Sequence, residues 1–423
     1  MAELPPSRIV YHRVYADPPT RSELAPSQLT DDGLPQLPPP PPSKKQKETA
    51  KRKPLPKLTT QRLAPVSVSA GGSFDGPSSP LLAAALPPPK KKRLRITCIS
   101  DTHNHTPYLP PGDVLIHAGD LTSQGTYSEL SNALSWLQRQ PHEVKLLVAG
   151  NHDGVSLDPE YTHTSTLTPA QSHAANLALF STPAAARAGI IYLRHEARTI
   201  TLRDGRRFRV FASPLSPSPP PPPGSKAWGF TYPPSTNPWL SIPADTDVLI
   251  THTPPKYHLD RSPSSLPPQP HAGCPHLRER LSQVRPVLHV FGHVHVGRGV
   301  EKVLWDDAAA PRVRHKEARV VEIQDPHPLR IKRQFLVDTI RVRDHVVVRG
   351  RETLLVNAAI ATGPWSRDTG HPGWGKAVVV DVEVECGDAA TAAAAGAQDG
   401  FGQEGRVRLR GVGEGWSAVD VVQ

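Results

Sequence analysis

Apolar runs of strand length recur along the chain from residue 96 onward, and several of them are continuous rather than alternating. Continuous apolar runs are typical of strands that are covered on both faces. The runs that predict strands are ITCIS (96–100), DVLIHAG (113–119), VKLLVAG (144–150), GIIYLR (189–194), RFRVFAS (207–213), TDVLITH (246–252), PVLHVFGH (286–293), TLLVNAAI (353–360) and AVVVDVEV (377–384). Two intervening segments, 127–140 and 274–284, have helical patterns, and the first puts leucines on one face. This alternation predicts an α/β core with functional residues at the C-terminal ends of the strands.

Several segments depart from this pattern and set the expected domain organisation. The Pro-rich stretch 213–225 predicts a surface insertion and not a central strand, because proline cannot donate to a sheet ladder. Residues 301–352 are charged with short Val-rich runs, which predict an inserted hairpin. A low-complexity segment and a C-terminal strand are expected at 387–423, and a disordered Pro-rich basic tail at 1–92. The folded domain is therefore expected at 93–386.

Composition and charge separate the tail from the rest of the chain. Fifty prolines and a hydrophobic fraction of 37% indicate that the 423 residues do not all pack into a core. Residues 1–95 hold 16 Lys or Arg against 7 Asp or Glu, whereas the remainder holds 33 against 32. The basic pI of about 9.6 is therefore a property of the tail. The run PKKKRLR at 89–95 resembles a nuclear-import signal, with a solvated charge run beside the fold boundary as the alternative.

The cysteines and the apolar segments bear on the compartment. Cys98, Cys274 and Cys386 lie far apart without a C-x-x-C pair, which suits a reducing compartment and indicates neither a disulfide framework nor a cysteine zinc site. The N-terminus has no apolar core of a secretory signal, and no run approaches 18 uninterrupted apolar residues. We expect an intracellular protein, cytoplasmic or nuclear, that is not secreted and does not contact a membrane.

Polar groups that are able to bind metals follow five of the predicted strands. They are Asp101-Thr102-His103, Gly119-Asp120, Gly150-Asn151-His152-Asp153, Thr251-His252-Thr253-Pro254-Pro255 and Gly292-His293-Val294-His295. Any one such block occurs by chance in many proteins, but the ordered set of five, each after a strand, is not a coincidence. His117 and His289 lie within strands and are interpreted as packed or hydrogen-bonded residues.

The spacing and chemistry of these groups indicate metal ions. Residues i and i+2 of an extended chain project to the same side, so Asp101 and His103, and likewise His293 and His295, can aim at one place. Carboxylates with imidazoles and one amide suit Mn²⁺, Fe or Zn²⁺ better than Ca²⁺. The groups exceed the needs of one ion, whereas two ions roughly 3.5–4 Å apart, bridged by one carboxylate, would use them all for in-line attack on phosphorus.

The series SDTHNH, GD, GNHD, THTPP and GHVH resembles the calcineurin-like metallophosphoesterase family and covers about 96–296. Within the family the chain is most similar to the metallophosphoesterase-domain-containing subgroup, on the features DVLIHAGDLT, WGF at 228–230, DVLITHTPP, RPVLHVFGHVH and the late Asn357. The resemblance implies a four-layer αββα sandwich of two facing sheets flanked by helices. It also implies that WGF forms part of the pocket wall, with a packed aromatic cluster as the alternative reading.

The resemblance also assigns roles to the residues of the five blocks. Asp101, His103 and His295 would bind the first ion, Asp120 would bridge, Asn151, His252 and His293 would bind the second, and His152 would assist the leaving group. Some subgroup members carry glycine at the position of His293, so its presence predicts a competent dimetal site. Mn²⁺ is the expected metal, with Fe or Zn²⁺ as alternatives.

These features predict a dimetal-dependent phosphoester hydrolase that uses a metal-bridging hydroxide for in-line attack. Ser/Thr protein phosphatases extend the second block as GD-x-x-D-R-G, whereas Ser123 and Gln124 occupy the Asp and Arg positions here. This difference favours a phosphodiesterase acting on a small phosphoester or a cyclic nucleotide. The alternatives are a DNA or RNA nuclease, for which residues 301–352 would supply a basic wall, and a catalytically silent scaffold. The sequence does not identify protein partners of the Pro-rich tail.

Overall fold

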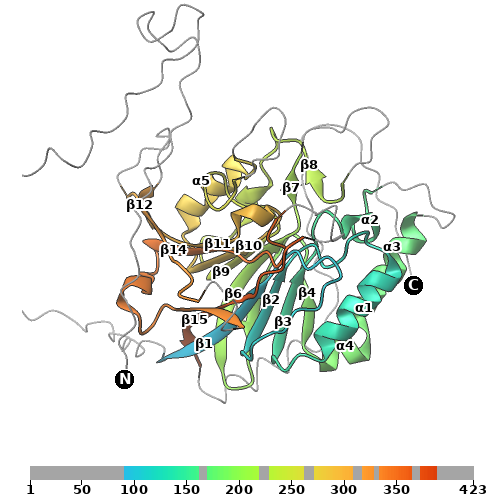
Figure 1. The fold of residues 1–423 in the computed structure, drawn as a ribbon, viewed down its shortest axis with the longest axis horizontal. Helices are drawn as coiled ribbons and strands as arrows, with labels where there is room; N and C mark the ends of the chain where they lie inside the picture. Colours follow the sequence, from blue (N-terminus) through green and yellow to red (C-terminus); the bar gives the residue numbers. More distant parts are fainter. Residues whose placement is uncertain are drawn as a thin grey trace, which may run out of the picture. The chain divides into compact units, whose positions relative to one another are not determined.

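The computed structural model describes residues 90–161, 169–218, 228–261, 271–307, 317–327, 333–363 and 372–387. Most strands of this part of the chain join one mixed sheet, and helices lie against it (Figure 1). The helices are α1 (Tyr127–Gln138), α2 (Gly154–Leu157), α3 (Pro169–Ala178), α4 (Pro183–Arg187) and α5 (Pro275–Val284). None of the helices in the described residues is long and apolar enough to cross a membrane.

Two sets of parallel strands form the two halves of the sheet. The first half contains β1 (Lys90–Ile99), β2 (Val114–Ala118), β3 (Val144–Val148) and β4 (Ile190–Tyr192). The second contains β6 (Arg206–Ser213), β9 (Val248–Thr251), β10 (Leu288–Phe291) and β14 (Glu352–Asn357), with β5 (Glu196–Thr201) antiparallel to β6. Each strand predicted from an apolar run is present within a few residues of the expected bounds, except that β1 begins six residues before the predicted Ile96.

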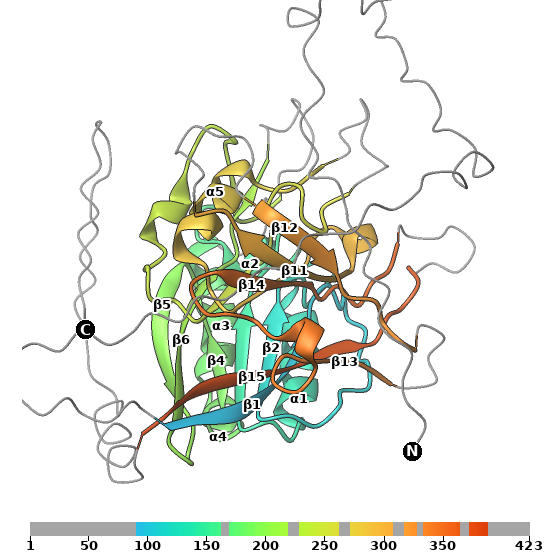
Figure 2. The same cartoon turned by 90° about the vertical axis from the view of Figure 1, so that its left-hand side faces the viewer.

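The long strand β15 (Ala377–Cys386) joins the halves. It pairs antiparallel with β1 from Lys90↔Cys386 to Cys98↔Val378, but it meets β6 only at Glu385↔Arg207 and Cys386↔Arg206. Figure 2 shows β1 and β15 side by side, with α5 on the opposite side of the molecule from α1 and α4. A connection of only two residue pairs lets the sheet fold over, so that its two halves face each other.

Three buried apolar clusters fill the spaces between the resulting layers. Side chains alternate across a strand, so neighbouring residues of β2 enter different clusters. Ile116 packs in a cluster shared by both halves of the sheet, together with Val210 of β6 and Val290 of β10. Leu115 faces the other way, toward a cluster that includes the α1 side chains Leu130, Leu134 and Leu137. The third cluster joins the second half to α5 through Leu277 and Leu281.

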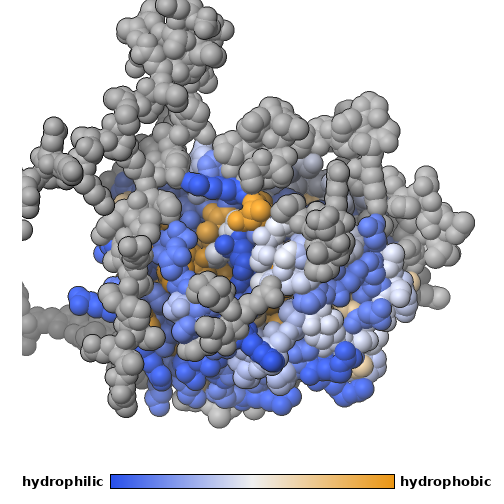
Figure 3. All heavy atoms as spheres, in the orientation of Figure 1, coloured by the Kyte–Doolittle hydropathy of each residue, from blue (hydrophilic) through white to orange (hydrophobic). Residues whose placement is uncertain are grey.

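The order helix, half-sheet, half-sheet, helix confirms the expected α/β fold with four layers. Most of the described surface in the view of Figure 3 is hydrophilic, and the strongest hydrophobic colour gathers near its centre. The apolar residues that predicted the strands therefore lie mainly in the three cores.

The segments outside the main pattern have mixed outcomes. Within 301–352, β11 (Gly299–Trp305) and β12 (Glu317–Glu322) form an antiparallel hairpin, and β11 also pairs with β14, so the hairpin extends the main sheet. The added strand β13 (Gln334–Asp338) runs parallel to β15 and was not expected. Two short strands, β7 (Ser216–Pro217) and β8 (Thr231–Tyr232), pair with each other.

The basic run before the first predicted strand is itself part of β1. Lys90, Lys91 and Lys92 are exposed and pair along β15, and Arg95 forms a bidentate ion pair with the buried Asp381. The expected tail at 1–92 lies outside the described residues except for its last three positions. The low-complexity segment and C-terminal strand expected at 387–423 lie outside them except for Gly387.

A buried charged network attaches the β11–β12 hairpin to the loop after β9. His258 lies between two carboxylates, with Nδ1 3.2 Å from Oε2 of Glu301 and Nε2 3.1 Å from Oε1 of Glu317. Arg278 of α5 donates two hydrogen bonds to Glu317. Burial disfavours the charged imidazole, but the two carboxylates outweigh it and raise the pKa of His258 to about 9.

We expect the stability of the hairpin attachment to depend on pH. The folded-state pKa of His258 lies above the unfolded value of about 6.5, so its contribution is complete below that value and is lost as pH rises through about 9. The variant His258→Gln should therefore unfold at lower urea concentration than wild type at neutral pH, and the difference should vanish near about pH 10. Urea titrations at both pH values measure this, and a pH-independent difference would contradict it.

Candidate metal centre

The eight residues predicted for the site follow the C-terminal ends of strands in both halves of the sheet. Asp101 and His103 follow β1, Asp120 follows β2, Asn151 and His152 follow β3, His252 follows β9, and His293 and His295 follow β10. Parallel strands present these ends at one edge, and the facing of the halves brings both edges together (Figure 1). The structure thus brings all eight residues into one continuous chain of contacts.

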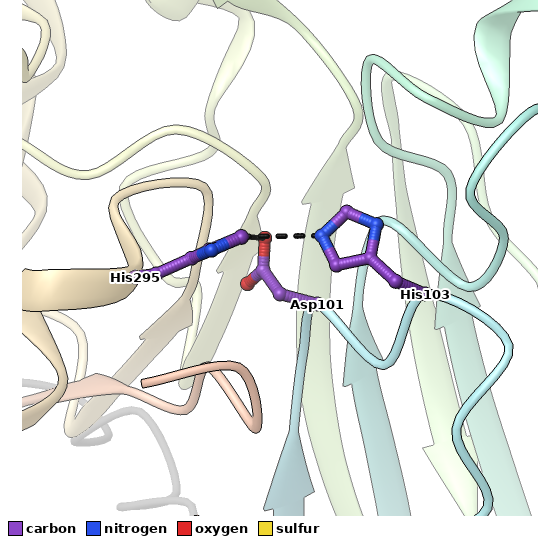
Figure 4. A group of neighbouring side chains, drawn as sticks. All are labelled: Asp101, His103 and His295. Carbon is purple, nitrogen blue, oxygen red and sulfur yellow. Dashed lines mark hydrogen bonds and ion pairs between the residues drawn. The ribbon is translucent and has the colours of Figure 1, made fainter. Parts of the chain in front are cut away.

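The first group contains Asp101, His103 and His295. Nε2 of His295 lies 3.3 Å from Oδ1 of Asp101 and 3.1 Å from Nε2 of His103. Figure 4 shows the two rings approaching each other across the Asp101 carboxylate. Potential ligand atoms of all three residues lie within 4.8 Å of one another, so the group is able to hold one ion.

The second group contains Asn151, His252 and His293. Oδ1 of Asn151 lies 2.9 Å from Nε2 of His252 and 2.8 Å from Nδ1 of His293. Asp120 lies between the groups, since its Oδ2 is 3.4 Å from Nε2 of His252 and 3.9 Å from Nε2 of His103. This position suits a carboxylate shared by two ions.

The proton positions on the histidines test whether these donors fit a metal. A neutral imidazole has one donor and one acceptor nitrogen. Nδ1 of His103 faces the Thr122 carbonyl at 3.3 Å, and Nδ1 of His295 faces the Gly363 carbonyl at 3.4 Å, so each Nδ1 carries the proton. Both Nε2 atoms are then acceptors, although they lie 3.1 Å apart. A cation between the two Nε2 atoms would remove the repulsion between their lone pairs, so these ligand atoms fit a divalent ion.

The same test applies to the second group. Nδ1 of His252 lies 3.0 Å from the Ala118 carbonyl and therefore donates to it, which aims the lone pair of Nε2 at the oxygens of Asn151 and Asp120. A carbonyl partner that fixes the tautomer of a ligating histidine is typical of metal sites. Only a proton or a metal ion on Nε2 makes these contacts favourable.

The charges of the centre also favour cations. Burial disfavours ionisation of Asp101, but without a metal ion a second proton on His295, at Nε2, donates to this carboxylate, outweighs burial and lowers the pKa of Asp101 to about 2. Burial opposes the charged form of His252 as well, but the Asp120 and Asp101 carboxylates raise its pKa to about 9. Two buried carboxylates are thus held ionised at neutral pH, and divalent ions would compete with protons for the space between them.

The backbone of the ligand loops is strained. Asp101, His103, Asp120 and His293 have positive φ angles of 51°, 44°, 52° and 67°. Each such residue costs on the order of 1 kcal/mol or more and persists only where the surroundings hold it. The Asp101 carboxylate accepts a hydrogen bond from the His293 backbone N–H at 3.0 Å, which fixes two of the strained residues against each other.

Glycines before the ligands allow the loops to approach one another. A Cβ atom at Gly292 would lie 2.0 Å from Oδ2 of Asp101, and one at Gly150 would lie 2.2 Å from Oδ1 of Asp120. The Asp101 and Asp120 carboxylates therefore occupy space that the side chain of any other residue type would fill.

His152 is held in one orientation beside the ligand groups. Its backbone N–H donates to Oδ1 of Asp120 at 2.8 Å, and its Nδ1 lies 2.9 Å from the carbonyl oxygen of Ser123. The ring contacts His103 edge-on at 4.7 Å and Trp228 at 4.4 Å between centroids. The backbone carbonyl of Ser123 thus orients His152 at the position where protein phosphatases carry an aspartate side chain.

Two residues that support the site were not recognised as functional in the sequence. Asp153 is fully buried and accepts hydrogen bonds from the backbone N–H groups of Leu121, Thr122 and Gly150, which join the loops after β2 and β3. The available signal was its place within the GNHD block. Asn357 stands out in the sequence only as a family feature; its amide donates to the carbonyl of Val294 at 2.9 Å and so supports the loop between His293 and His295.

The strain at His293 leads to a prediction for the metal-free and metal-bound protein. His293→Gly should lower the affinity for the second ion, since a ligand is lost, while glycine relieves the strain of φ 67°. His293→Ala loses the same ligand but keeps the strain. In the presence of chelator, its free energy of unfolding should therefore be about 1 kcal/mol lower than that of His293→Gly. Metal content after dialysis and urea titration measure the two effects. Equal stability of the two variants would contradict the role of strain.

The site and fold agree with a comparison against protein families. The model of the calcineurin-like phosphoesterase family matches residues 94–297, which include all five blocks. A UPF0046 protein of Caenorhabditis elegans is 31% identical over 215 residues, which cover 50% of this chain and 72% of that protein. The chain belongs to the calcineurin-like phosphoesterase family, and membership implies a metal-dependent phosphoester hydrolase.

Two further relatives place the chain more closely. Metallophosphoesterase domain-containing protein 1 of Homo sapiens is 35% identical over 224 residues, which cover 49% of this chain and 62% of that protein. Probable rhamnogalacturonate lyase C of Emericella nidulans is 39% identical over 275 residues, which cover 64% of this chain but 23% of that protein. The resemblance to the metallophosphoesterase-domain-containing subgroup is confirmed. The chain spans less than two thirds of the length of each of these two relatives. The activities of those whole proteins are therefore not assigned to this chain.

Proposed function

We propose that the chain is a phosphodiesterase that uses two divalent metal ions, with Mn²⁺ as the first choice. The observation that carries this proposal is the complete donor set, in which Asp120 lies between two groups whose lone pairs converge. Asp101, His103 and His295 would hold one ion, Asn151, His252 and His293 the other, and Asp120 both. Bound there, the ions supply a nucleophile by lowering the pKa of water and neutralise the non-bridging phosphate oxygens.

The protein groups around the donors determine orientation and proton transfer. The Ser123 carbonyl accepts from Nδ1–H of His152, so Nε2 is the nitrogen that is able to donate to a departing alkoxide. The Asp153 carboxylate holds the loops that carry Asp120 and Asn151 in register through their backbone N–H groups. Correct placement of these groups before the substrate arrives lowers the cost of reaching the transition state.

The residues that differ from protein phosphatases support a diester substrate. A phosphate monoester carries an additional negative charge, which the arginine of the GD-x-x-D-R-G block neutralises in those enzymes. Gln124 occupies that position here. Arg298, which lies close after His295 in the chain, donates instead to the carbonyl oxygens of Ala359 and Lys376. A diester needs less positive charge from the protein and therefore fits this site better.

The proposal is tested with a substrate panel assayed with Mn²⁺. We expect turnover of bis-p-nitrophenyl phosphate, with p-nitrophenyl phosphate hydrolysed far more slowly, and 3′,5′-cyclic nucleotides test the cyclic class. Chelation should abolish turnover and Mn²⁺ should restore it. Faster hydrolysis of the monoester would indicate a phosphatase and contradict the phosphodiesterase proposal. Metal binding without any turnover would indicate a catalytically silent scaffold.

A further inference from the structure

Trp228 is a large aromatic residue that is half-exposed beside the proposed proton donor. Its side chain remains 45% exposed, while its ring lies 4.4 Å from the ring of His152 at an angle of 43°. His152 also contacts the ring of His103, with centroids 4.7 Å apart and ring planes at 79°. The imidazole therefore contacts both a candidate ligand and an indole that also presents apolar surface to its surroundings.

The backbone directly after Trp228 is fixed to the loop that carries His152. The N–H of Gly229 donates to the Asn151 carbonyl at 3.2 Å, and the N–H of Phe230 donates to Oδ2 of Asp158 at 2.6 Å. Gly229 also packs against Gly154 so closely that a Cβ atom on Gly229 would lie 2.2 Å from the Gly154 Cα atom.

This close glycine contact and the buried ring of Phe230, which is 7% exposed, hold the two residues that directly follow Trp228. An aromatic ring on a rigid support loses little conformational entropy when a second ring packs against it. The support moves together with the loop of His152, so the indole keeps its position relative to the proton donor.

We propose that Trp228 forms the wall of a leaving-group subsite that favours phosphoesters with a flat aromatic group on the departing oxygen. The inference rests on the proposed function, because His152 marks the side on which the leaving group departs. An aromatic group bonded to phosphorus and directed toward His152 reaches the neighbouring indole. Contact between two rings improves binding by about tenfold over an alkyl group that is too small to cover the indole.

The test uses binding, so that it does not depend on turnover. Phenylphosphonate and methylphosphonate present an aromatic and an alkyl group on a carbon–phosphorus bond that a phosphoesterase does not cleave. We expect the Mn²⁺-loaded protein to bind phenylphosphonate about tenfold more tightly in calorimetry. Trp228→Ala should remove this difference while leaving the affinity for methylphosphonate unchanged, and Trp228→Phe should retain much of it. Leu240→Ala, which changes a residue 68% exposed on a separate 3₁₀ turn (Pro238–Ser241), is the matched control.

Each outcome decides the inference. Equal affinities of the two phosphonates for wild type, or an equal loss of both in Trp228→Ala, would overturn the subsite. In turnover of bis-p-nitrophenyl phosphate, Trp228→Ala should raise KM about tenfold with little change in kcat. A fall in kcat alone would show that the indole only positions His152. If wild type hydrolyses no diester but prefers phenylphosphonate, the subsite stands and the proposed function fails.

Discussion

Replacing Asp120 with alanine is expected to abolish phosphoester hydrolysis. Its Oδ2 lies 3.4 Å from Nε2 of His252 and 3.9 Å from Nε2 of His103, so one carboxylate serves both ligand groups. Its Oδ1 also accepts the backbone N–H of His152, so the variant loses a charge, a shared ligand and a support of the proton donor. Metal ions stabilise the transition-state charge by several kcal/mol, and the expected fall in kcat is therefore about 10³-fold or more.

The backbone at Asp120 decides which control is informative. Asp120 has a φ of 52°, which alanine adopts with strain but asparagine tolerates well. Asp120→Asn should therefore unfold closer to wild type than Asp120→Ala and be nearly as inactive, since the amide is uncharged. Asp204→Ala, which removes a carboxylate paired with Arg206 on the surface, should keep full activity. Turnover at the wild-type rate by Asp120→Ala, with metal present, would disprove the dimetal mechanism.

The strand ends were predictable because their physical signals are local. A run such as VKLLV at 144–148 has no polar residue except Lys145, and it is followed by alanine and then by glycine and a potential ligand. Lys145 is itself buried, since its ammonium donates to the carbonyl oxygens of His142 and Ala188. The convergence of the blocks within each half of the sheet then follows from the geometry of parallel strands. The meeting of the two sets depends in addition on the long-range pairing of β15, which lets the two halves face each other.

Strand pairing and loop conformation could not be predicted in the same way. The sequence QFLVD at 334–338 is short and flanked by charge, and its strand exists because β15 offers a parallel partner more than forty residues later. The first strand begins at Lys90 rather than Ile96 because β15 pairs with its basic residues, whose side chains reach solvent. Such pairings depend on neighbours that a local pattern does not contain.

The detailed backbone geometry of the site could not be predicted from local sequence patterns either. The left-handed backbone at Asp101 and His103 is disfavoured for both residue types and is imposed by contacts with the loop after β2. The i and i+2 argument for extended chain therefore gave the correct grouping of these two residues, although the backbone there is not extended. The role of the Ser123 carbonyl was equally hidden, because it depends on a main-chain atom.

His152→Gln is expected to lower kcat by about 10²- to 10⁴-fold, the usual contribution of a general acid. The Ser123 carbonyl fixes Nδ1, so the ring donates through Nε2, and glutamine has no group of comparable acidity to replace it. The loss should depend on the leaving group. It should be larger for a diester of phenol than for one of p-nitrophenol, because the more basic phenolate needs the proton more.

Metal content distinguishes this role from ligation. His152 lies within 4.8 Å of His103 and Asp120 by potential ligand atoms, so geometry also permits it to bind an ion. If His152 is the proton donor, His152→Gln should retain both metal ions after dialysis and hydrolyse the p-nitrophenyl diester with a smaller loss. The matched variant His252→Gln removes a residue of the second group and should lose metal as well as activity. Loss of metal from His152→Gln, with an equal loss of kcat for the phenyl and p-nitrophenyl diesters, would show that His152 is a metal ligand instead.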